Sequence, residues 1–419
     1  MLRRRGLYAV VILLVLFALL HVNFSPKEQA FNEKLAIVLG GFAYLLMSMS
    51  LLLSTRAKWL ESLCGGLDRV YQLHKIAGVC VLFALLPHFF SAPEALPAGA
   101  DIAANALIPS KPLGMFALIL AVLLLIVTLN RKISYNRWFS THKFMGLVYI
   151  LATGHLMTMP PVFFERTSPA GIMLITASIV GILSFIYTLF IMKKRNTALY
   201  KIEAITSLER ATEVVLSPKG KGIAHKAGQF AFVTILGKGW QEPHPFTISS
   251  APNENKLRFT IKVLGDWTRK VREELQTGLS VKIQGPYGKF DCAKAGKKQV
   301  WIAGGIGLTP FLSTLRAMEK GDTREIHMVY ATRSQADAIF LDALKSYENT
   351  LENITLRTLY SDEGQFAKGE VIQEQLTEAL TDYDYFICGP KPMVTALIRY
   401  LRKAGVARNK IHCEAFEFR

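Results

Sequence analysis

The chain has 419 residues, of which 51% are hydrophobic, a share too high for an ordinary soluble protein of this length. Its formal net charge is +17, from 49 basic and 32 acidic residues. A basic balance suits nucleic-acid binding, but the sequence has none of the motifs that read bases, which argues against that class. The five cysteines have no Cys-x-x-Cys spacing, so neither a disulfide framework nor a zinc site is indicated.

Almost all the long apolar runs fall in about the first 190 residues, and the remainder has the composition of a soluble enzyme. The first run follows Arg3–Arg5 like a signal peptide, but no small-x-small cleavage site comes after it, so we expect a retained helix. Most of the apolar segments approach the about 20 residues that cross a bilayer as a helix. They predict a six-helix transmembrane bundle with spans at residues 7–22, 35–53, 67–90, 113–129, 141–159 and 171–192.

Basic residues between the spans predict the orientation of the bundle. Cytoplasmic loops of membrane proteins carry an excess of Lys and Arg. If six helices alternate, one side holds Arg3–Arg5, Arg56, Lys58, Arg131, Lys132, Arg137 and Lys193–Arg195, and the other holds only Lys27, Lys34, Lys111 and Arg166. The richer side is therefore expected to be cytoplasmic, with both ends of the chain and the whole C-terminal half.

Two of the predicted spans carry a histidine near each end: His74 and His88 in the third, His142 and His155 in the fifth. An ionisable side chain in hydrocarbon costs several kcal/mol and is a functional candidate by default. The separations of 14 and 13 residues equal about 21 and 20 Å of helix rise, roughly two thirds of the hydrocarbon thickness. Matched by depth, the four residues form an inner pair, His74 with His142, and an outer pair, His88 with His155.

Such pairs suit two stacked haems. Imidazole is a good iron ligand, and two of them leave no open axial position, so the metal carries electrons instead of binding oxygen. The alternative is that each histidine is isolated and hydrogen-bonded to backbone near a helix end. Four at paired depths make that the weaker interpretation, whereas His21, which has no counterpart, fits it.

The helical phase of the fifth span does not match that of the third. At about 100° per residue, 14 positions return to within roughly 40° of the start, so His74 and His88 share a face. Thirteen positions miss by about 140°. We therefore expect the fifth span to be distorted, or its two haems to be approached at different angles; Gly146 and Gly154 would permit local deformation.

The C-terminal half predicts two further domains. Period-2 or β-branched runs at residues 201–208, 212–217, 229–236, 257–264 and 279–285 indicate a small antiparallel β-barrel that ends near Cys292. After Gly296 the order strand, Gly-rich turn, helix repeats, which is typical of a parallel α/β sheet. The expected domains are 1–195 (membrane), 196–294 (barrel) and 295–419 (α/β).

Several motifs in these domains suit dinucleotides. In His244–Ser249, an aromatic next to hydroxyl residues can stack on a flavin and hydrogen-bond its N5 edge. Gly265–Thr268 and Gly285–Gly288 supply tight turns whose backbone N–H groups can approach a pyrophosphate. Gly304–Pro310 follows a strand and opens a helix, where a second dinucleotide can rest, and Cys388–Pro390 ends a later strand at the ligand-binding edge. Each turn alone could be structural, but all of these motifs together, in this order, are hard to explain without dinucleotide binding.

On these motifs the C-terminal half resembles the ferredoxin–NADP⁺ reductase superfamily. With the His-x13-His and His-x12-His segments in front, the whole chain resembles the NADPH oxidase and ferric reductase family, most of all its compact bacterial members without calcium-binding domains. The resemblance covers nearly all 419 residues. It implies a flavocytochrome b of the inner (plasma) membrane, with two haem b, an FAD, and NADPH or NADH as the donor.

The resemblance also implies roles for individual residues. Phe246 and Thr247 would contact the isoalloxazine, and His244 would stand where the reductases usually have an arginine facing the pyrophosphate. Thr268 and Gly288 would hold FAD phosphates. The cofactor-binding set would be His244, Pro245, Phe246, Thr247, Ser249, Lys262, Gly265, Thr268, Gly285, Tyr287, Gly288, Gly304, Gly305, Gly307, Thr309, Pro310, Arg333, Cys388, Gly389, Pro390 and Phe416.

Residues near the nicotinamide come from the later part of the chain. By the same resemblance Cys388 would lie beside the nicotinamide ring, and Arg333 would bind the 2′-phosphate of NADPH, one arginine being weak evidence against NADH. The ending from Glu414 resembles the terminal Glu-x-aromatic of the reductases. Phe416 would cover the flavin face, with Phe418 as the alternate, so the catalytic set would be Thr247, Cys388, Phe416 and Phe418.

One departure concerns the electron acceptor. The animal oxidases place an extra histidine four residues beyond the outer ligand of the third span, with an arginine nearby, to handle oxygen. Here that position is Ala92, and the outer half of the second span has no arginine. The resemblance thus implies electron export to oxygen or a ferric chelate, and the departure at Ala92 argues against superoxide as the product. Two rivals stay open: an electron-delivery subunit for an extracytoplasmic protein or quinone, and a transporter with a regulatory nucleotide-binding domain.

Overall fold

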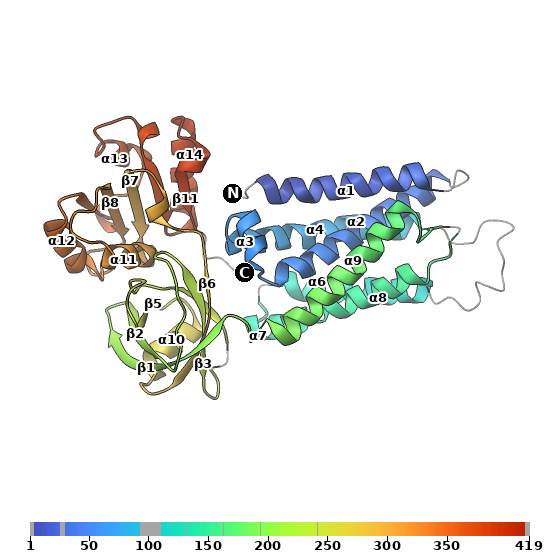
Figure 1. Ribbon diagram of the computed structural model, residues 1–419, viewed down its shortest axis with the longest axis horizontal. Helices are drawn as coiled ribbons and strands as arrows, with labels where there is room; N and C mark the ends of the chain where they lie inside the picture. Colours follow the sequence, from blue (N-terminus) through green and yellow to red (C-terminus); the bar gives the residue numbers. More distant parts are fainter. Residues whose placement is uncertain are drawn as a thin grey trace. The chain divides into compact units, whose positions relative to one another are not determined.

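The structure is a computed structural model that describes residues 4–25, 30–92, 110–130, 132–161, 163–192, 194–240 and 242–414. The chain divides into two compact units, Met1–Lys194 and Arg195–Arg419. The described part of the first unit is helical, and the second contains two β-sheets with helices (Figure 1).

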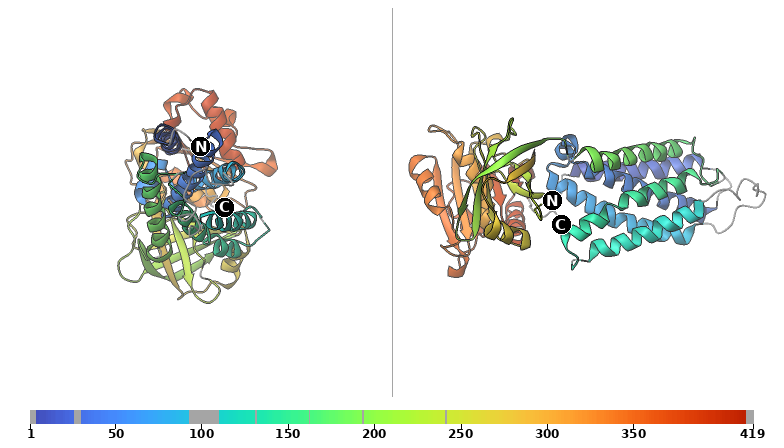
Figure 2. Two further views of the ribbon diagram at one scale, coloured as in Figure 1. Left: turned by 90° about the vertical axis from the view of Figure 1, so that its right-hand side faces the viewer. Right: turned by 90° about the horizontal axis from the view of Figure 1, so that it is seen from below.

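The long helices of the first unit run roughly along one direction (Figure 2). Their apolar sequences and the scarcity of charged residues within them account for this bundle, because backbone groups in lipid must be satisfied inside each helix. The helices are α1 (Arg4–Phe24), α2 (Phe31–Ser54), α3 (Lys58–Cys64), α4 (Leu67–Ser91), α6 (Ser110–Leu129), α7 (Tyr135–His142), α8 (Met145–Met157) and α9 (Pro169–Ile186), which continues into a π-helical turn, η1 (Tyr187–Ile191).

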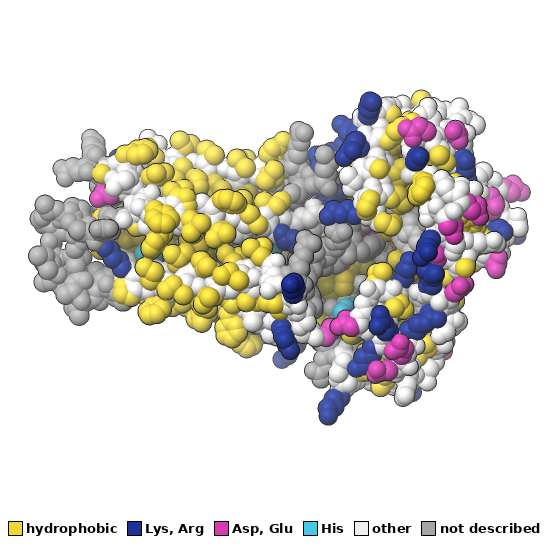
Figure 3. Space-filling model, turned by 180° about the vertical axis from the view of Figure 1, so that it is seen from behind, with side chains coloured by type: hydrophobic (Ala, Val, Ile, Leu, Met, Phe, Trp, Pro, Cys, Tyr) yellow, Lys and Arg dark blue, Asp and Glu magenta, His cyan; other side chains and the backbone are white. Residues whose placement is uncertain are grey.

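Five of these helices are long and apolar enough to cross a membrane: α1, α2, α4, α6, and α9 with its π-helical turn. Only 17% to 39% of each span is buried, so most of its apolar side chains face outward. Hydrophobic side chains cover the visible face of this unit, while charged ones gather on the other unit (Figure 3). An outward apolar surface of this kind matches a lipid environment.

The expected count of six uninterrupted spans is not confirmed. The segment predicted at residues 141–159 is divided between α7, which ends at His142, and α8, which begins at Met145 and has 13 residues. At the junction the amides of Phe144 and Gly146 bond to carbonyls three residues back, at 3.0 and 3.1 Å, as in a tightened turn. The expected distortion of this span is therefore confirmed, and it takes the form of a break directly after His142.

A polar cluster joins three helices inside the bundle. The Tyr44 hydroxyl of α2 lies 2.7 Å from the hydroxyls of Thr153 in α8 and Ser178 in α9. The Tyr44 ring stacks on Tyr149, with ring centres 4.9 Å apart, and the Tyr149 hydroxyl donates to the Ala177 carbonyl at 2.7 Å. Buried polar groups that are paired in this way hold helices together where lipid offers no hydrophobic drive.

The first sheet of the second unit is antiparallel and nearly closed, in the order β4-β3-β6-β1-β2-β5. The bridge between Ile248 and Phe259, and the bond from the Ser249 amide to the Arg258 carbonyl at 2.8 Å, bring its two ends together. Its strands are β1 (Thr197–Ser207), β2 (Ala211–Pro218), β3 (Phe230–Leu236), β4 (His244–Thr247), β5 (Leu257–Lys262) and β6 (Ser280–Tyr287), with α10 (Asp266–Glu274) between β5 and β6.

The second sheet is parallel, in the order β11-β10-β7-β8-β9, as the alternation of strands and helices predicts. Buried apolar residues fill both faces, which explains why its strands read as continuous hydrophobic runs. Its elements are β7 (Lys298–Gly304), the 3-10 turn η3 (Gly305–Leu308), α11 (Thr309–Arg316), β8 (Glu325–Thr332), α12 (Leu341–Thr350), β9 (Ile354–Tyr360), α13 (Gly369–Gln373), β10 (Asp384–Cys388), α14 (Lys391–Lys403) and β11 (Ile411–Cys413).

Candidate functional site

The four membrane histidines lie together in the two pairs that their depths predict. The ring centres of His74 and His142 are 6.0 Å apart, at an interplanar angle of 71°. Those of His88 and His155 are 6.3 Å apart, at 73°. One member of each pair comes from α4. The break between α7 and α8 explains how the other members, only 13 residues apart, both reach α4.

The Nδ1 atom of every one of these rings has a hydrogen-bond partner on another helix. His74 lies 3.0 Å from the Ser50 carbonyl, and His88 lies 2.7 Å from the Ala36 carbonyl, both acceptors being on α2. His155 lies 2.8 Å from the carbonyl of Ser110 on α6. Since a carbonyl only accepts, each of these Nδ1 atoms carries the proton, and Nε2 keeps its lone pair for a ligand bond.

His142 is held differently. Its Nδ1 lies 3.3 Å from the hydroxyl of Thr128 on α6, and that hydroxyl donates its own proton to the Leu124 carbonyl at 2.7 Å. The hydroxyl oxygen can therefore accept from the His142 ring, as a longer bond than the other three. The ring also lies against Trp138, with centres 5.2 Å apart.

Two glycines make room for the outer pair. A Cβ added at Gly40 would lie 2.8 Å from the Nδ1 and Cε1 atoms of His88, and one at Gly114 would lie 2.9 Å from Nδ1 of His155. Real Cβ atoms do not approach ring atoms so closely, so only glycine fits there. Sequence reasoning missed Gly40, Gly114, Ser110 and Thr128, because they lie on helices other than those of the histidines and nothing local marks them.

The donor set fits a metal between the two rings of each pair. An imidazole nitrogen binds a metal at about 2.0 Å, and the ring centre lies roughly 1 Å behind it, so ring centres about 6 Å apart are expected across one ion. Both observed distances meet this value. The described residues contain no group of three or more His, Cys, Asp and Glu side chains for a metal, so the chain offers two-coordinate imidazole sites that suit an iron porphyrin.

In the second unit, His244, Pro245, Phe246 and Thr247 form strand β4 itself, at the edge of the antiparallel sheet. The His244 ring lies 4.0 Å from that of Trp267, and Phe246 stacks on Trp267 at 5.7 Å. Trp267 belongs to the segment Gly265–Thr268, so the structure brings these two predicted motifs together into one aromatic cluster.

The surroundings of His244 favour its neutral form. Its Nε2 lies 3.2 Å from Oε2 of Glu242. Burial lowers the pKa of His244 below its usual range, although the neighbouring Glu242 carboxylate works in the opposite direction. A neutral imidazole can hydrogen-bond a phosphate but cannot supply the fixed charge of the arginine that the reductase resemblance implies at this position.

Two segments that were expected to be turns have other structures. Gly265 is the N-cap of α10, where the Thr268 hydroxyl accepts from the amides of Leu264 and Gly265 at 2.8 and 2.9 Å, so Thr268 caps a helix. Gly285, Pro286 and Tyr287 are the end of β6, with a cis bond before Pro286. Tyr287 is buried against Phe230 and Phe232.

Gly288 lies close to the buried carboxyl group of Glu414. Its φ is +104°, and an added Cβ would lie 2.8 Å from Oε1 of Glu414. Burial first and the negative charge of Glu414 second raise the pKa of the Cys388 thiol well above its usual range. Gly288, Glu414 and Cys388 are therefore gathered in one place, with Cys388 as a neutral thiol.

The Gly-rich turn and the Cys388–Pro390 segment meet backbone to backbone at the carboxyl edge of the parallel sheet. An added Cβ at Gly307 would lie 2.3 Å from the Cys388 carbonyl oxygen, and one at Gly389 would lie 2.9 Å from Cα of Gly304. Their strands β7 and β10 are neighbours, with Ala303 paired to Cys388. Ligands of such sheets bind at this edge, where a helix begins.

The remaining predicted residues are distributed around this edge. Gly305 has φ +54°, and an added Cβ there would lie 3.8 Å from Nζ of Lys262, so the barrel lysine reaches the Gly-rich turn. Thr309 and Pro310 are buried in the first turn of α11, and Ser249 is buried just beyond β4. Arg333 is exposed directly after β8, and no described residue bonds its guanidinium group. Phe416 and Phe418 lie outside the described residues.

Three family models match separate parts of this chain. They are a ferric reductase like transmembrane component over residues 39–153, an FAD-binding domain over residues 198–291 and an oxidoreductase NAD-binding domain over residues 301–398. Dual oxidase 2 of Sus scrofa is 26% identical over 253 residues, which cover 53% of this chain and 15% of that protein. These findings match the NADPH oxidase and ferric reductase family, as the resemblance implies. The chain is therefore an oxidoreductase with a membrane component and with FAD- and NAD-binding domains.

Two further curated relatives each match about half of this chain. The electron transfer component of anthranilate 1,2-dioxygenase from Acinetobacter baylyi is 26% identical, over 53% of this chain and 67% of that protein. A flavohemoprotein of Rhizobium meliloti is 29% identical, over 49% and 56%. The chain thus spans about two thirds or less of the length of these curated relatives.

A solved structure extends the likeness along the chain. It is a flavohemoglobin from Malassezia yamatoensis with bound FAD and heme. It aligns with 93% of this chain and 99% of its own, with a TM-score of 0.52 and 17% identity. At that identity the likeness concerns the fold.

Proposed function

We propose that the protein passes electrons from NAD(P)H, by way of FAD and two b-type haems, to an acceptor on the opposite side of the membrane. The observation that carries this proposal is the pair of two-histidine sites, each with ring centres about 6 Å apart and with every Nδ1 atom engaged. When bound, the flavin converts a two-electron donation into the one-electron transfers that haem iron accepts.

The residues of the first unit would hold two haem groups. His74 and His142 would bind the inner one, and His88 and His155 would bind the outer one. The carbonyls of Ser50, Ala36 and Ser110 keep the rings in the tautomer that leaves Nε2 free. Iron held by two imidazoles would supply one-electron transfer and would leave no position for oxygen to bind.

In the second unit, β4 and Trp267 would hold the flavin, with Thr247 at its N5 edge. The backbone amides of Gly304–Gly307 and the start of α11 would hold the nicotinamide dinucleotide, with Lys262 and Arg333 facing its phosphates. The neutral, buried thiol of Cys388 would lie beside the nicotinamide ring, where an apolar surface excludes water. Phe416, or Phe418 in its place, would cover the flavin until the nicotinamide displaces it.

The orientation proposed is cytoplasmic for both termini and for the nucleotide-binding unit, in the inner (plasma) membrane. Support comes from two basic residues close in sequence to His142: Lys132, between α6 and α7, and Arg137, in α7. The acceptor proposed is oxygen, giving superoxide, or a ferric chelate. Ala92 favours the alternative that the chain delivers electrons to an extracytoplasmic protein or quinone, because no histidine for oxygen chemistry stands there.

A spectroscopic experiment tests the proposal. Purified, full-length protein loaded with FAD and haem should show a two-histidine haem spectrum, and anaerobic addition of NADPH should reduce it. Oxidation of NADPH with the haem remaining oxidised would overturn the mechanism. Comparing the reduction of oxygen, ferric chelates, quinones and cytochrome c, with and without superoxide dismutase, then distinguishes the acceptors.

A further inference from the structure

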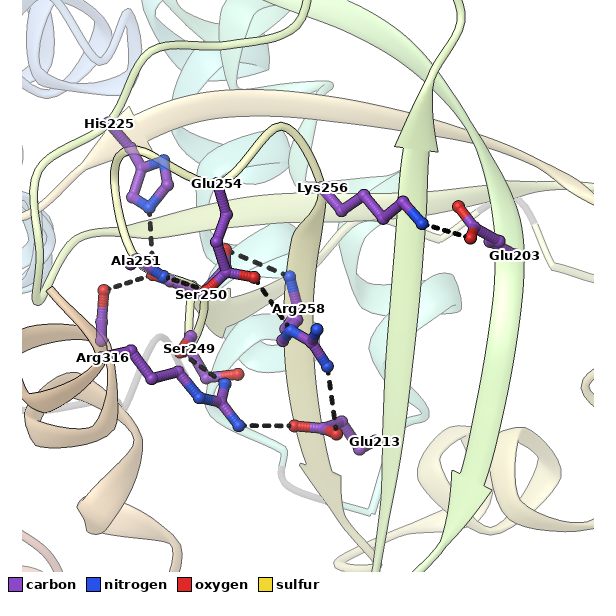
Figure 4. A network of polar contacts seen from close by, with 11 residues as sticks. Glu203, Glu213, His225, Ser249, Ser250, Ala251, Glu254, Lys256, Arg258 and Arg316 are labelled. Carbon is purple, nitrogen blue, oxygen red and sulfur yellow. Dashed lines mark hydrogen bonds and ion pairs between the residues drawn. The ribbon is translucent and has the colours of Figure 1, made fainter. Parts of the chain in front are cut away.

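The residues that follow the proposed flavin-binding strand are bonded by a helix of the neighbouring sheet. Nη1 of Arg316 donates to the Ser249 carbonyl at 2.7 Å (Figure 4). The Ser313 hydroxyl donates to the Ser250 carbonyl at 2.6 Å. Both donors lie on α11, whereas Ser249 and Ser250 come directly after β4. Ser249, Ser250 and Ser313 are completely buried, so the contact lies in the interior of the second unit.

Arg316 bonds a third element through its other nitrogen. Nη2 of Arg316 lies 3.2 Å from Oε1 of Glu213 on β2. The second oxygen of Glu213 is 3.9 Å from Nη1 of Arg258, which in turn bonds Glu254 at 3.0 Å (Figure 4). The planar guanidinium group thus spans a carboxylate on one strand and a carbonyl beyond another, which fixes its position as well as its charge.

The same helix begins at the Gly-rich turn. α11 starts at Thr309, directly after Gly305–Leu308, and ends at Arg316. Eight helical residues extend about 12 Å as a stiff rod. One rigid element therefore touches the proposed dinucleotide turn at its first residue and the proposed flavin segment at its last.

We infer that Arg316 is a positioning residue for hydride transfer, because it sets the distance between the dinucleotide turn and the flavin-binding strand. This inference rests on the proposed function. The transfer moves a hydride from the nicotinamide to the flavin, so the dinucleotide is oxidised and the flavin reduced. Reacting atoms must approach to about 3–3.5 Å, and a misplacement of about 1 Å costs roughly 100-fold in rate.

The test is the rate of flavin reduction by NADPH in stopped flow, without oxygen, in the full-length protein. Arg316→Gln should lower the limiting rate at saturating NADPH by 10-fold or more. The FAD content and the apparent Kd for NADPH should stay within about threefold of wild type, since no ligand-contacting group is lost. Arg316→Lys, which keeps the charge but only one of the two contacts, should recover part of the rate.

A second ion pair supplies a matched control. Nε of Arg210, in the turn between β1 and β2, lies 2.9 Å from Oδ1 of Asp337, which follows β8. This pair joins the same two sheets but bonds neither α11 nor the segment after β4. Arg210→Gln should leave the limiting rate unchanged.

Three outcomes would overturn the inference: a limiting rate for Arg316→Gln within twofold of wild type, an equal loss in Arg210→Gln, or a loss confined to the Kd for NADPH. If Arg316→Gln fails to retain FAD, Arg316→Lys with FAD bound decides, and a wild-type limiting rate in that variant overturns it. Failure of wild-type protein to transfer a hydride at all would instead overturn the proposed function.

Discussion

The Nδ1 acceptors distinguish the four paired histidines from one another. Three rings donate to backbone carbonyls at 2.7 to 3.0 Å, whereas His142 reaches a hydroxyl at 3.3 Å. A stronger acceptor at Nδ1 makes the ligand nitrogen more basic, which stabilises the oxidised metal. Of the proposed ligands, one in the inner pair therefore has a weak hydrogen bond at Nδ1, whereas both in the outer pair have strong ones.

Thr128→Val should change the potential of the inner site alone. Valine has a similar shape but no acceptor, so the ligand nitrogen of His142 becomes less basic and the inner midpoint potential should rise by some tens of millivolts. Thr128→Ser keeps the acceptor and should titrate like wild type. The measurement is a spectroelectrochemical titration of the haem absorbance. An equal shift of both potentials would contradict the assignment of Thr128 to the inner pair.

Gly114→Ala and Gly40→Ala should damage the outer site. The added methyl group meets a histidine ring at 2.8 to 2.9 Å, so the ring must move from its ligand position. Each variant should lose half or more of the outer haem, measured as the haem-to-protein ratio of the purified chain. Gly154→Ala is the control, because its methyl group meets only the end of the flexible Leu113 side chain, at 3.1 Å. Full haem occupancy in both outer variants would rule out this packing role.

His225 should make the second unit sensitive to acid. Its Nε2 donates to the Ser250 carbonyl at 3.3 Å, and burial lowers the pKa of His225, with Glu254 working against that shift. A lowered pKa in the folded state means that the neutral form stabilises the fold above about pH 6.5, and that this stability is lost as the pH falls toward the folded value. His225→Gln keeps a donor but does not titrate.

The measurement for His225 is thermal unfolding of the full chain between pH 5 and 8. Unfolding is monitored by the rise in fluorescence as FAD is released. Wild-type Tm should fall below about pH 6.5 more steeply than that of His225→Gln. Parallel curves would show that His225 does not carry the acid sensitivity.

At the scale of elements, strands were predicted more fully than contacts. The run predicted at residues 229–236 contains β3, because β-branched and aromatic residues favour a strand. The hydroxyl of Thr268 caps α10, and its contact with a phosphate stays a prediction, since a Gly-x-x-Thr segment suits both uses. The residues that contact the histidines, such as Gly114, were not predicted, because their role depends on which helices become neighbours. Tertiary packing decides this, and no periodic pattern in the sequence shows it.

The spacing of His142 and His155 predicted either a distorted span or haems approached at different angles, and the break between α7 and α8 yields a test. In an unbroken helix, a spacing of 14 residues would put both histidines on one face, as in α4. The double variant His155→Leu with Leu156→His creates that spacing. In the broken segment it should abolish the outer site, because residue 156 packs into the core shared with Phe164. The measurement compares the haem content of the double variant with that of His155→Leu alone. Recovery of the outer haem in the double variant would mean a continuous fifth helix.

At the scale of the whole molecule, the proposed function joins in one chain a unit that accepts a hydride from NAD(P)H and a membrane path for single electrons. His74 and His88 lie on α4, one of the five helices among the described residues that are apolar and long enough to span a membrane, and the two sheets supply the edges proposed to bind nucleotides. Because the outer pair is the last carrier in the proposed order, everything before it should continue to work when it is removed. Removal of the outer pair therefore distinguishes loss of electron transfer across the membrane from loss of flavin reduction.

His88→Leu and His155→Leu should therefore stop transmembrane electron transfer while flavin reduction by NADPH continues. In vesicles with NADPH on one side and membrane-impermeant ferricyanide trapped on the other, wild-type protein should reduce the trapped acceptor. The two variants should lose at least 90% of that rate, because no second carrier spans the remaining hydrocarbon. Their flavin should be reduced at the wild-type rate, and the inner haem should still respond to NADPH. Undiminished reduction of the trapped acceptor in either variant would exclude the outer pair from the electron path.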